Sequence, residues 1–284
     1  MAEAAKGAVL VTGASSGIGE ATAFHLGSLG FRVFGGVRKD ADAERLSERG
    51  GERLTPVKLD VTDAGSIDST REQIDEAAPE GLSGLVNNAG VSVTGPVEFI
   101  PIDEFRRQLE VNLLGQVAVT QAFLPAIRRA RGRIVNVSSI GGRIALPLMS
   151  PYNASKFALE AVSDSLRREV RRFGVHVAVI EPGAIRTAIW EKGTVAADEM
   201  MEGAPPEAEQ LYGELVRGMR AQADEATGRA IEPVEVARVV EHALTAARPR
   251  TRYVIGRDAK LRARLSGLLP DRAFDRLIER ALSR

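Results

Sequence analysis

The segment Ala8-Val-Leu-Val-Thr-Gly-Ala-Ser-Ser-Gly-Ile-Gly19 opens with a short apolar run and continues into a glycine-rich loop. The apolar run is typical of a strand buried in a parallel sheet. Helix-forming residues then extend over Glu20–Leu29. A strand, a glycine loop and a helix in this order form the context that a dinucleotide-binding site requires. Gly13 permits a tight turn, whereas Gly17 and Gly19 let backbone N–H groups at the helix N-terminus approach a pyrophosphate.

The spacing Gly-x-x-x-Gly-x-Gly differs from the commoner Gly-x-Gly-x-x-Gly, so the rest of the chain must support this interpretation. With helices between them, further apolar strands are expected at 31–37, 54–59, 82–86, 133–137, 175–180 and 251–256. This alternation predicts an α/β fold, a doubly wound (Rossmann) parallel sheet of about seven strands with helices on both faces. In such sheets ligands bind outside the carboxyl ends of the strands.

Polar and glycine-containing segments follow several of the predicted strands directly. They are Asn87-Asn-Ala-Gly90, Ser138-Ser139 and the segment Pro182-Gly-Ala-Ile-Arg-Thr187. Each could be a plain turn when taken alone. Because the carboxyl ends of parallel strands meet at one edge, their coincidence predicts a binding site there.

Arg38 follows the second predicted strand, where many NAD-binding folds place an acid that binds the ribose 2′-hydroxyl. An arginine at this point accommodates a 2′-phosphate instead, so it favours NADP(H) over NAD(H), although surface arginines after strands are common. Asp60 and Val61 follow the third strand. The Asp60 carboxylate could bond an adenine amino group, or it could cap the next helix, as Thr62 or Asp63 could do equally well.

The segment Ser150-Pro-Tyr-Asn-Ala-Ser-Lys156 begins a predicted helix that runs to Phe173. Ser150 is a suitable N-cap, and Pro151 suits the first helical position. Tyr152 and Lys156 are four residues apart, which puts both on one helix face with Cβ atoms about 6 Å apart. An isolated tyrosine titrates near ~10, and a nearby ammonium lowers this pKa. Taken alone, such a pair is also compatible with an ordinary helix surface.

Residues 102–130 are predicted to form one long helix that is broken near Pro125. Asn112 lies inside this helix among apolar neighbours. Asparagine competes with the helical backbone for hydrogen bonds and is disfavoured in this position. A residue that is unfavourable at its position in a predicted helix indicates a functional site.

The composition excludes several other classes of function. Acidic and basic residues balance at 38 each and aromatic residues make up 5%, so nothing indicates a nucleic-acid partner. There is no cysteine, and the three histidines are dispersed, which argues against disulfides, thiol nucleophiles and a metal site. The polar N-terminus lacks the pattern of a signal peptide, and no apolar run reaches the ~20 residues of a transmembrane helix. We therefore expect a cytoplasmic protein.

Together these motifs resemble the short-chain dehydrogenase/reductase family, densely over Ala8–Gly183 and more loosely to Gly256. The matching elements, in order and spacing, are Thr12-Gly-x-x-x-Gly-x-Gly19, Asn87-Asn-Ala-Gly90, Asn112, Ser139 and Tyr152-x-x-x-Lys156. The resemblance implies an oxidoreductase in which a nicotinamide cofactor carries the hydride and the protein handles the proton.

By this resemblance Tyr152 is the catalytic acid/base, and Ser139 hydrogen-bonds the substrate oxygen. Ser139 is preferred to Ser138 because its spacing to the tyrosine matches the family. Lys156 would bind the nicotinamide ribose and lower the Tyr152 pKa, and Asn112 would hold a water in a proton relay. The implied cofactor-binding residues are Gly13, Ser15, Ser16, Gly17, Ile18, Gly19, Arg38, Asp60, Val61, Asn88, Ala89, Gly90, Tyr152, Lys156, Pro182, Gly183, Ile185 and Thr187.

Residues 1–256 are predicted to form a single dinucleotide-binding and catalytic domain, in which 188–227 resembles the family's substrate lid. Residues 257–284 are predicted to form a C-terminal helical extension interrupted at Pro270, with leucines at helical spacing. This extension and the run before it resemble the branch of the family that acts on steroids, retinol and lipid alcohols. We expect it to pack against the body or a partner subunit, with peripheral contact to an anionic membrane as the alternative.

The expected reaction is hydride transfer between NADP(H), or NAD(H), and a secondary alcohol or ketone, or an aldehyde, with a hydrophobic, steroid-, retinoid- or lipid-like substrate. One alternative is a catalytically silent nucleotide-sensing or scaffold protein of the same fold. Another is an isomerase or dehydratase with a tightly held cofactor. Because family members commonly pair through the two long helices, a homodimer or homotetramer is expected.

Overall fold

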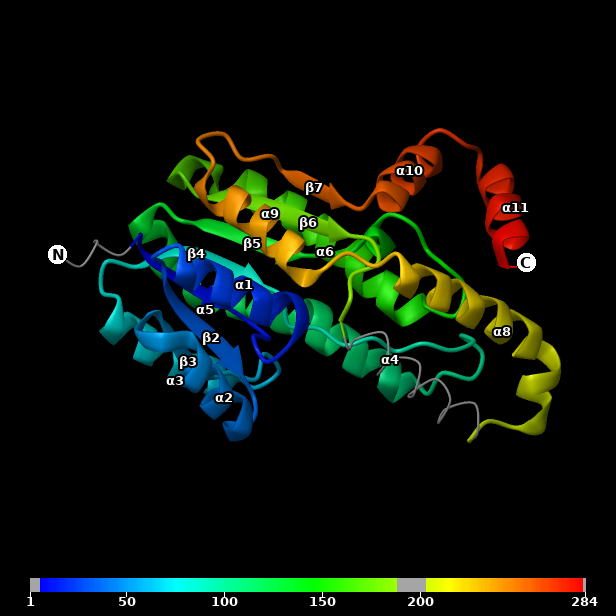
Figure 1. The fold of residues 1–284 in the computed structure, drawn as a ribbon, viewed down its shortest axis with the longest axis horizontal. Coiled ribbons are helices and arrows are strands. Elements are labelled where there is room, and N and C mark those ends of the chain that lie inside the picture. The colour runs from blue at the N-terminus through cyan, green and yellow to red at the C-terminus, as the bar shows by residue number, and fades with distance from the viewer. Residues whose placement is uncertain (1–5, 188–202, 283–284) are drawn as a thin grey trace.

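The computed structural model describes residues 6–187 and 203–282, and its centre is a seven-stranded sheet in which every neighbouring pair is parallel. The strand order is β3-β2-β1-β4-β5-β6-β7 (Figure 1). The strands are β1 Ala8–Val11, β2 Arg32–Val37, β3 Leu54–Lys58, β4 Leu82–Asn87, β5 Arg133–Val137, β6 His176–Pro182 and β7 Arg252–Ile255. The predicted doubly wound α/β fold is confirmed.

Helices cover both faces of the sheet. They are α1 Gly17–Ser28, α2 Asp40–Gly50, α3 Ala64–Ala77, α4 Ile102–Leu109, α5 Gly115–Ala130, α6 Ser150–Val170, α8 Pro206–Gly228, α9 Pro233–Thr245, α10 Arg257–Ser266 and α11 Asp271–Leu282. Helices α1 and α9 pack side by side on one face, and α3, α5 and α6 cover the other (Figure 1). The carboxyl ends of the strands point toward the side of the molecule where α4, α8 and α10 lie.

Successive residues of β1 serve two separate cores. Val9 and Val11 of β1 belong to the core under α1 and α9, whereas Ala8 and Leu10 belong to the core under α3 and α5. Side chains alternate across a strand, so a strand covered on both faces must be apolar throughout. This requirement explains the unbroken apolar run of β1.

The predicted break of the 102–130 helix at Pro125 is wrong. Pro125 lies inside α5, and the interruption is instead a five-residue π-helix, Glu110–Leu114, between α4 and α5. Pro125 and Gln121 are both exposed, so water can bond the carbonyl that the proline leaves without a donor. The π-helix surrounds Asn112, the residue whose position inside a helix was anomalous.

Helix α6 begins at Ser150, one residue before the predicted first position Pro151, so the predicted capping role of this serine is wrong. Met149 is the N-cap residue, and the buried Ser150 hydroxyl has no hydrogen-bond partner in the part of the chain that the structure describes. Pro151 occupies the first turn, as expected from its fixed backbone and missing N–H.

Helices α8, α10 and α11 lie together at one end of the molecule (Figure 1). Helix α11 packs on α8, where Gly218 leaves room for the Leu282 carbonyl. Pro270 separates α10 from α11, as the sequence predicts. Of the predicted lid, residues 188–202 lie outside the described residues, and much of the remainder is α8. Within the described ranges, none of the helices is both long and apolar enough to span a bilayer.

Candidate active site

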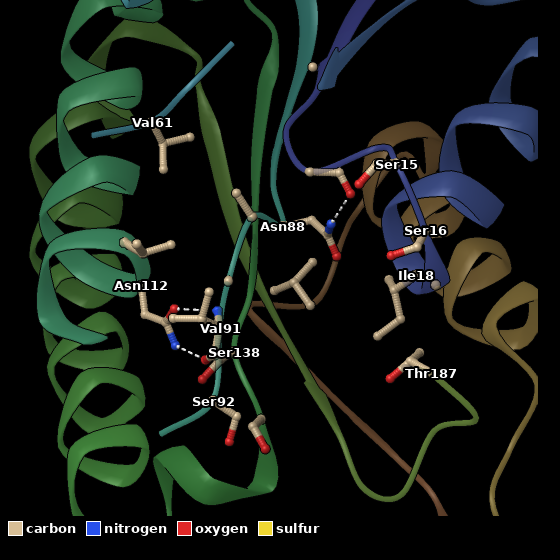
Figure 2. A pocket seen from close by; sticks show the side chains of 18 of the residues that line it. Ser15, Ser16, Ile18, Val61, Asn88, Val91, Ser92, Asn112, Ser138 and Thr187 are labelled. Atoms are coloured by element: carbon tan, nitrogen blue, oxygen red, sulfur yellow. Dashed lines mark hydrogen bonds between the residues drawn. The ribbon is translucent and has the colours of Figure 1, made fainter. Parts of the chain in front are cut away.

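A cavity of about 400 Å³ opens at the carboxyl edge of the sheet. All of the predicted site residues line it except Gly19. Figure 2 shows Ser15, Ser16, Ile18 and Thr187 on one side of this cavity and Val91, Ser92, Asn112 and Ser138 on the other, with Asn88 between them. Segments that are far apart in the sequence therefore converge on one site, as their common position after strands predicts.

Gly19 is not part of the cavity wall, and its predicted contact with the cofactor stays a prediction. A Cβ atom at this position would collide with the Gly13 carbonyl oxygen and the Asn88 amide nitrogen. The absence of a side chain at Gly19 thus lets helix α1 pack closely against the first loop.

The glycine loop forms a cradle at the N-terminus of α1. Gly13 and Gly17 have φ angles of +65° and +58°, a region that favours glycine. A Cβ on Gly17 would lie 3.0 Å from the Thr187 Cγ2. Ser16 is the N-cap of α1, but its side chain makes no capping bond to any described residue, so the first N–H groups face the cavity. This arrangement fits the pyrophosphate of a dinucleotide.

Thr12 and Asn88 fasten the ends of β1 and β4 to each other. The Thr12 hydroxyl accepts hydrogen bonds from the backbone N–H groups of Asn88 (2.9 Å) and Ala89 (3.0 Å). The Asn88 side chain donates to the carbonyls of Thr12 (2.9 Å) and Gly13 (3.1 Å). The Asn87-Asn-Ala-Gly90 segment is therefore more than a plain turn, because it bonds across to the end of a neighbouring strand.

A row of buried polar side chains holds the segment 87–93 that follows β4. Gln108, Asn112, Gln116 and Thr120 are spaced by four residues along α4, the π-helix and α5, and all four bond to this segment. Sequence reasoning identified Asn112 alone. The regular spacing of the other three was the signal that could have revealed the row.

Asn112 is fully buried and is held by three hydrogen bonds. Its oxygen accepts from the Val91 N–H (2.9 Å), and its nitrogen donates to the Val91 carbonyl (3.0 Å) and to the Ser155 hydroxyl (3.3 Å). Asn112 thereby joins the π-helix to α6, one residue before Lys156.

Ser139 and Tyr152 lie next to each other in the cavity wall. Ser139 begins the short 3-10 helix η3 (Ile140–Gly142), and its hydroxyl accepts from the Gly141 N–H at 3.0 Å. Burial raises the pKa of Tyr152, and a hydrogen bond with the Ser139 hydroxyl opposes this shift. The predicted lowering of the Tyr152 pKa is therefore wrong for this structure, because desolvation outweighs the favourable interactions of the phenolate. At neutral pH the phenol is protonated and can donate.

The Lys156 ammonium is buried below Tyr152. Its Nζ donates to the Val137 carbonyl at 2.8 Å and lies 5.8 Å from the centre of the Tyr152 ring. Burial lowers the pKa of Lys156 to about 8, and the nearby Glu160 carboxylate acts in the opposite direction. Lys156 therefore carries a proton over most of the physiological range.

Arg38 and Asp60 lie in the same cavity wall, away from Tyr152 along the sheet edge. Asp60 accepts hydrogen bonds from both the N–H (2.9 Å) and the hydroxyl (2.7 Å) of Thr62. Burial raises the pKa of Asp60, but the Thr62 bonds and the Arg38 charge outweigh it, and the net shift is downward. The capping role left open for Asp60 belongs to Asp63, which accepts from two N–H groups of α3.

A second pocket of about 320 Å³ adjoins the first cavity. The two share Ser139, Tyr152, Gly183, Ile185 and Thr187. Apolar side chains line this pocket from two sides. The segment from η3 to the start of α6 supplies Ile140, Ile144, Leu146 and Met149. Helix α8 and the residues just after it supply Met219, Ala223, Ala226 and Ala230. The junction between the polar cavity and the apolar pocket is formed in part by the Ser139 and Tyr152 side chains.

A family model described as short chain dehydrogenase matches residues 7–197 of this sequence. The chain belongs to the short-chain dehydrogenase family. This dehydrogenase is 42% identical over 259 residues to the Homo sapiens protein named retinol dehydrogenase 16, an alignment that covers 89% of this chain and 81% of that protein. It is 36% identical over 281 residues to the NADPH-dependent 3-dehydrocapnine reductase of Ornithobacterium rhinotracheale, which covers 97% of both chains.

Among solved structures, the dehydrogenase resembles a short chain dehydrogenase from Burkholderia cenocepacia in complex with NADP. The TM-score is 0.73 at 27% sequence identity, and the alignment covers 99% of both chains. With the family model and the named relatives, this similarity identifies the chain as an oxidoreductase.

Beneath the active site the dehydrogenase has a charged network that sequence reasoning missed. Glu181 is fully buried at the end of β6 and binds Arg143 through both carboxylate oxygens, at 2.6 and 2.8 Å. Arg252 of β7 lies 3.4 Å from Glu181 and also binds Glu160 (3.0 Å) and Asp164 (2.9 Å) of α6. The network ties η3, α6, β6 and β7 together. Its members are far apart in the sequence, so no local spacing could have revealed it.

Proposed function

We propose that this dehydrogenase interconverts a hydrophobic alcohol and its ketone or aldehyde, with NADP(H) as the preferred cofactor and NAD(H) as the second. One observation carries the proposal. Ser139 and Tyr152 belong both to the wall of the polar cavity and to that of the apolar pocket. A proton donor at such a junction can reach a substrate oxygen while the cofactor occupies the neighbouring cavity.

When bound, the nicotinamide ring supplies or accepts the hydride. The glycine loop would hold the pyrophosphate, Asp60 and Val61 the adenine end, and Pro182–Thr187 the nicotinamide end, with Asn88–Gly90 between them. The polar cavity offers these groups a continuous wall.

In reduction the protonated Tyr152 gives its proton to the substrate oxygen, to which the Ser139 hydroxyl also donates. The Lys156 ammonium stabilises the phenolate that remains, and it also binds the nicotinamide ribose. In oxidation the proton moves in the opposite direction. Asn112 ties the segment around Val91 to the start of α6 and so helps to position Tyr152 and Lys156. That Asn112 also holds a water in a proton relay stays a prediction.

The preference for NADP(H) rests on Arg38, which follows β2 and lines the polar cavity. A 36% identical relative is named as NADPH-dependent, and a 27% identical structure was solved with NADP. The hydrophobic substrate class rests on the apolar pocket and on the similarity to a protein named retinol dehydrogenase.

The test is steady-state oxidation of NADPH and NADH by the purified protein with a panel of long-chain ketones and aldehydes. We expect turnover with several members of the panel and a higher kcat/KM with NADPH. Absence of turnover with every member, in a protein that binds NADPH, would support the catalytically silent alternative instead.

A homodimer or homotetramer paired through the helices of 102–130 and 151–173 is also proposed. Leu114 and Phe157 belong to these helices and are 52% and 43% exposed, so both offer apolar area to such an interface. A cytoplasmic location, the division into a domain and an extension, and peripheral membrane contact by the extension stay predictions.

A further inference from the structure

One turn after Lys156, helix α6 carries a second buried charge, the Glu160 carboxylate. The two residues are four positions apart, so their side chains share a helix face, with Cβ atoms about 6 Å apart. Both are buried, at 5% and 8% exposure. Opposite charges at this spacing commonly pair, as Glu225 and Arg229 do at 2.8 Å. Lys156 and Glu160, both among the described residues, form no ion pair with each other.

Each of these two charges is bound by another partner. The Lys156 Nζ donates to the Val137 carbonyl at 2.8 Å and lies 5.8 Å from the centre of the Tyr152 ring. The Glu160 Oε2 accepts from the Arg252 Nε at 3.0 Å. Within residues 6–187 and 203–282, Arg252 is the one cation at ion-pair distance from Glu160. Arg252 therefore competes with Lys156 for this carboxylate.

The Glu160 carboxylate has an oxygen left for a competing bond. Its Oε1 is buried and has no hydrogen-bond partner in the part of the chain that the structure describes. The η3 backbone packs closely here, since a Cβ on Gly142 would lie 3.1 Å from both the Glu160 Cγ and the Lys156 carbonyl oxygen. Charges in such a buried place interact more strongly than in water. Without its arginine, the carboxylate would therefore bind Lys156, the cation one turn away.

The elements packed against α6 offer Lys156 and Glu160 few other charges. Their charged residues have partners of their own: Glu181 of β6 with Arg143 of η3, and Asp103 with Arg106 and Glu104 with Arg107 within α4, each at 2.6 Å. The buried residue of the π-helix, Asn112, is uncharged, and the arginines of η4 (Arg171–Phe173) lie at the other end of α6. Arg252 is thus the group that decides whether Glu160 is available to Lys156.

From these contacts we propose that Arg252 is a positioning residue of the reaction: by binding Glu160 it keeps that carboxylate from drawing the Lys156 ammonium away from its place below Tyr152. Arg252 lines neither the polar cavity nor the apolar pocket, so it acts through Glu160. The inference rests on the proposed function, since it extends the part that Lys156 plays there.

The test is a double-mutant cycle on Arg252 and Glu160, with the kcat of ketone reduction by NADPH as the readout. The pH is about 6.5, below the Lys156 pKa of about 8. For Arg252→Gln we expect kcat to fall about tenfold, because the ammonium moves to Glu160. For the double variant Arg252→Gln/Glu160→Gln we expect kcat within about threefold of the parent, because no carboxylate is left to attract the ammonium.

Two further variants complete the design. Arg252→Lys keeps a positive charge beside Glu160 and should also stay within about threefold of the parent kcat. Arg167→Gln is the matched control: it removes another arginine bound to Asp164, at 2.7 Å, but leaves Glu160 with its partner. We expect this control to keep the parent kcat.

The pH profile distinguishes positioning from a merely structural role. Burial lowers the pKa of Lys156 to about 8, and the Glu160 charge opposes this shift. Without Arg252 the Glu160 charge acts more strongly, so Arg252→Gln should raise the pKa of Lys156 and move the alkaline fall in rate to higher pH. In the double variant the Glu160 charge is absent, so the fall should move to lower pH than in the parent.

If the double variant is no faster than Arg252→Gln, or if the alkaline fall does not move, the inference is overturned and the proposed function stands. The arm of the cycle that starts from Glu160→Gln does not need a folded Arg252→Gln variant. In that arm, adding Arg252→Gln should leave kcat unchanged, and a tenfold fall would overturn the inference. A parent enzyme that binds NADPH but reduces no ketone would contradict the proposed function, and the inference with it.

Discussion

The polar cavity and the apolar pocket meet at Tyr152, yet they are built in different ways. The walls of the polar cavity come from strand ends and from the π-helix, which are joined by partly buried hydrogen bonds such as those of Thr12, Asn88 and Asn112. The outer wall of the apolar pocket comes from α8 and α10, which lie beyond the sheet (Figure 1). Under the proposed function, the sheet edge carries the reaction and the helices beyond the sheet select the substrate.

The largest effect that separates the two regions is expected for Lys156→Met. Loss of the ammonium removes the charge that stabilises the Tyr152 phenolate, so kcat/KM is expected to fall about 100-fold with every substrate. Because burial of the ammonium is unfavourable, as its lowered pKa of about 8 indicates, the melting temperature should be equal or higher. Steady-state kinetics and thermal unfolding check both expectations. If the melting temperature of Lys156→Met falls together with its kcat/KM, the loss of activity reflects unfolding and this account is contradicted.

Arg38→Asp should affect the polar cavity alone. Loss of the guanidinium is expected to weaken NADP binding by about 2 kcal/mol, or roughly thirtyfold, because a bond between charged groups is lost. NAD binding should change little. Titration of both cofactors measures this, with Lys39→Asp as the control, since Lys39 is outside the cavity wall. An equal change for both cofactors would remove the basis for the NADP preference.

Ala226→Phe should affect the apolar pocket alone. The larger side chain fills part of the pocket, so the KM of a long-chain ketone is expected to rise about tenfold while NADPH affinity stays constant. The control is Ala221→Phe, an exposed position of α8 outside the pocket wall. If both variants behave alike, α8 does not bound the substrate.

The smallest effect concerns pH. The Glu160 carboxylate raises the pKa of Lys156, so Glu160→Gln should lower that pKa below about 8. The rate of ketone reduction is expected to fall on the alkaline side as Lys156 loses its proton, and the variant should shift this limb to lower pH. Asp164→Asn also removes a partner of Arg252 and is the control. If the alkaline fall in rate occurs at the same pH in the parent and in Glu160→Gln, a group other than Lys156 causes it.

The sheet and most of the cofactor cavity could be predicted because the relevant signals are local. Gly13, Asn88 and Ser139 each follow an apolar strand, so each is predicted to lie at the carboxyl edge of the sheet. Gly19 was placed in the same wall because a glycine motif does not distinguish contact with a ligand from contact with a neighbouring loop.

Other features depend on tertiary contacts and could not be predicted. The pKa of Tyr152 rises because the folded chain buries the phenol, which the four-residue spacing to Lys156 does not reveal. Glu181 meets Arg143 and Arg252 only after β6, η3 and β7 come together. The break lies at Asn112 rather than Pro125, where the Asn112 side chain binds the Val91 backbone, a contact between residues 21 positions apart.

The most direct test of the central claim is the rate of NADPH oxidation by Tyr152→Phe at a saturating concentration of a ketone that the parent reduces. The account predicts a fall in kcat of about 1,000-fold with NADPH affinity retained, because the proton donor is lost and the cavity is not. Tyr212→Phe, which loses a hydroxyl bonded to Glu98 outside both cavities, should keep the parent rate. A Tyr152→Phe variant that turns over at the parent rate would contradict the account.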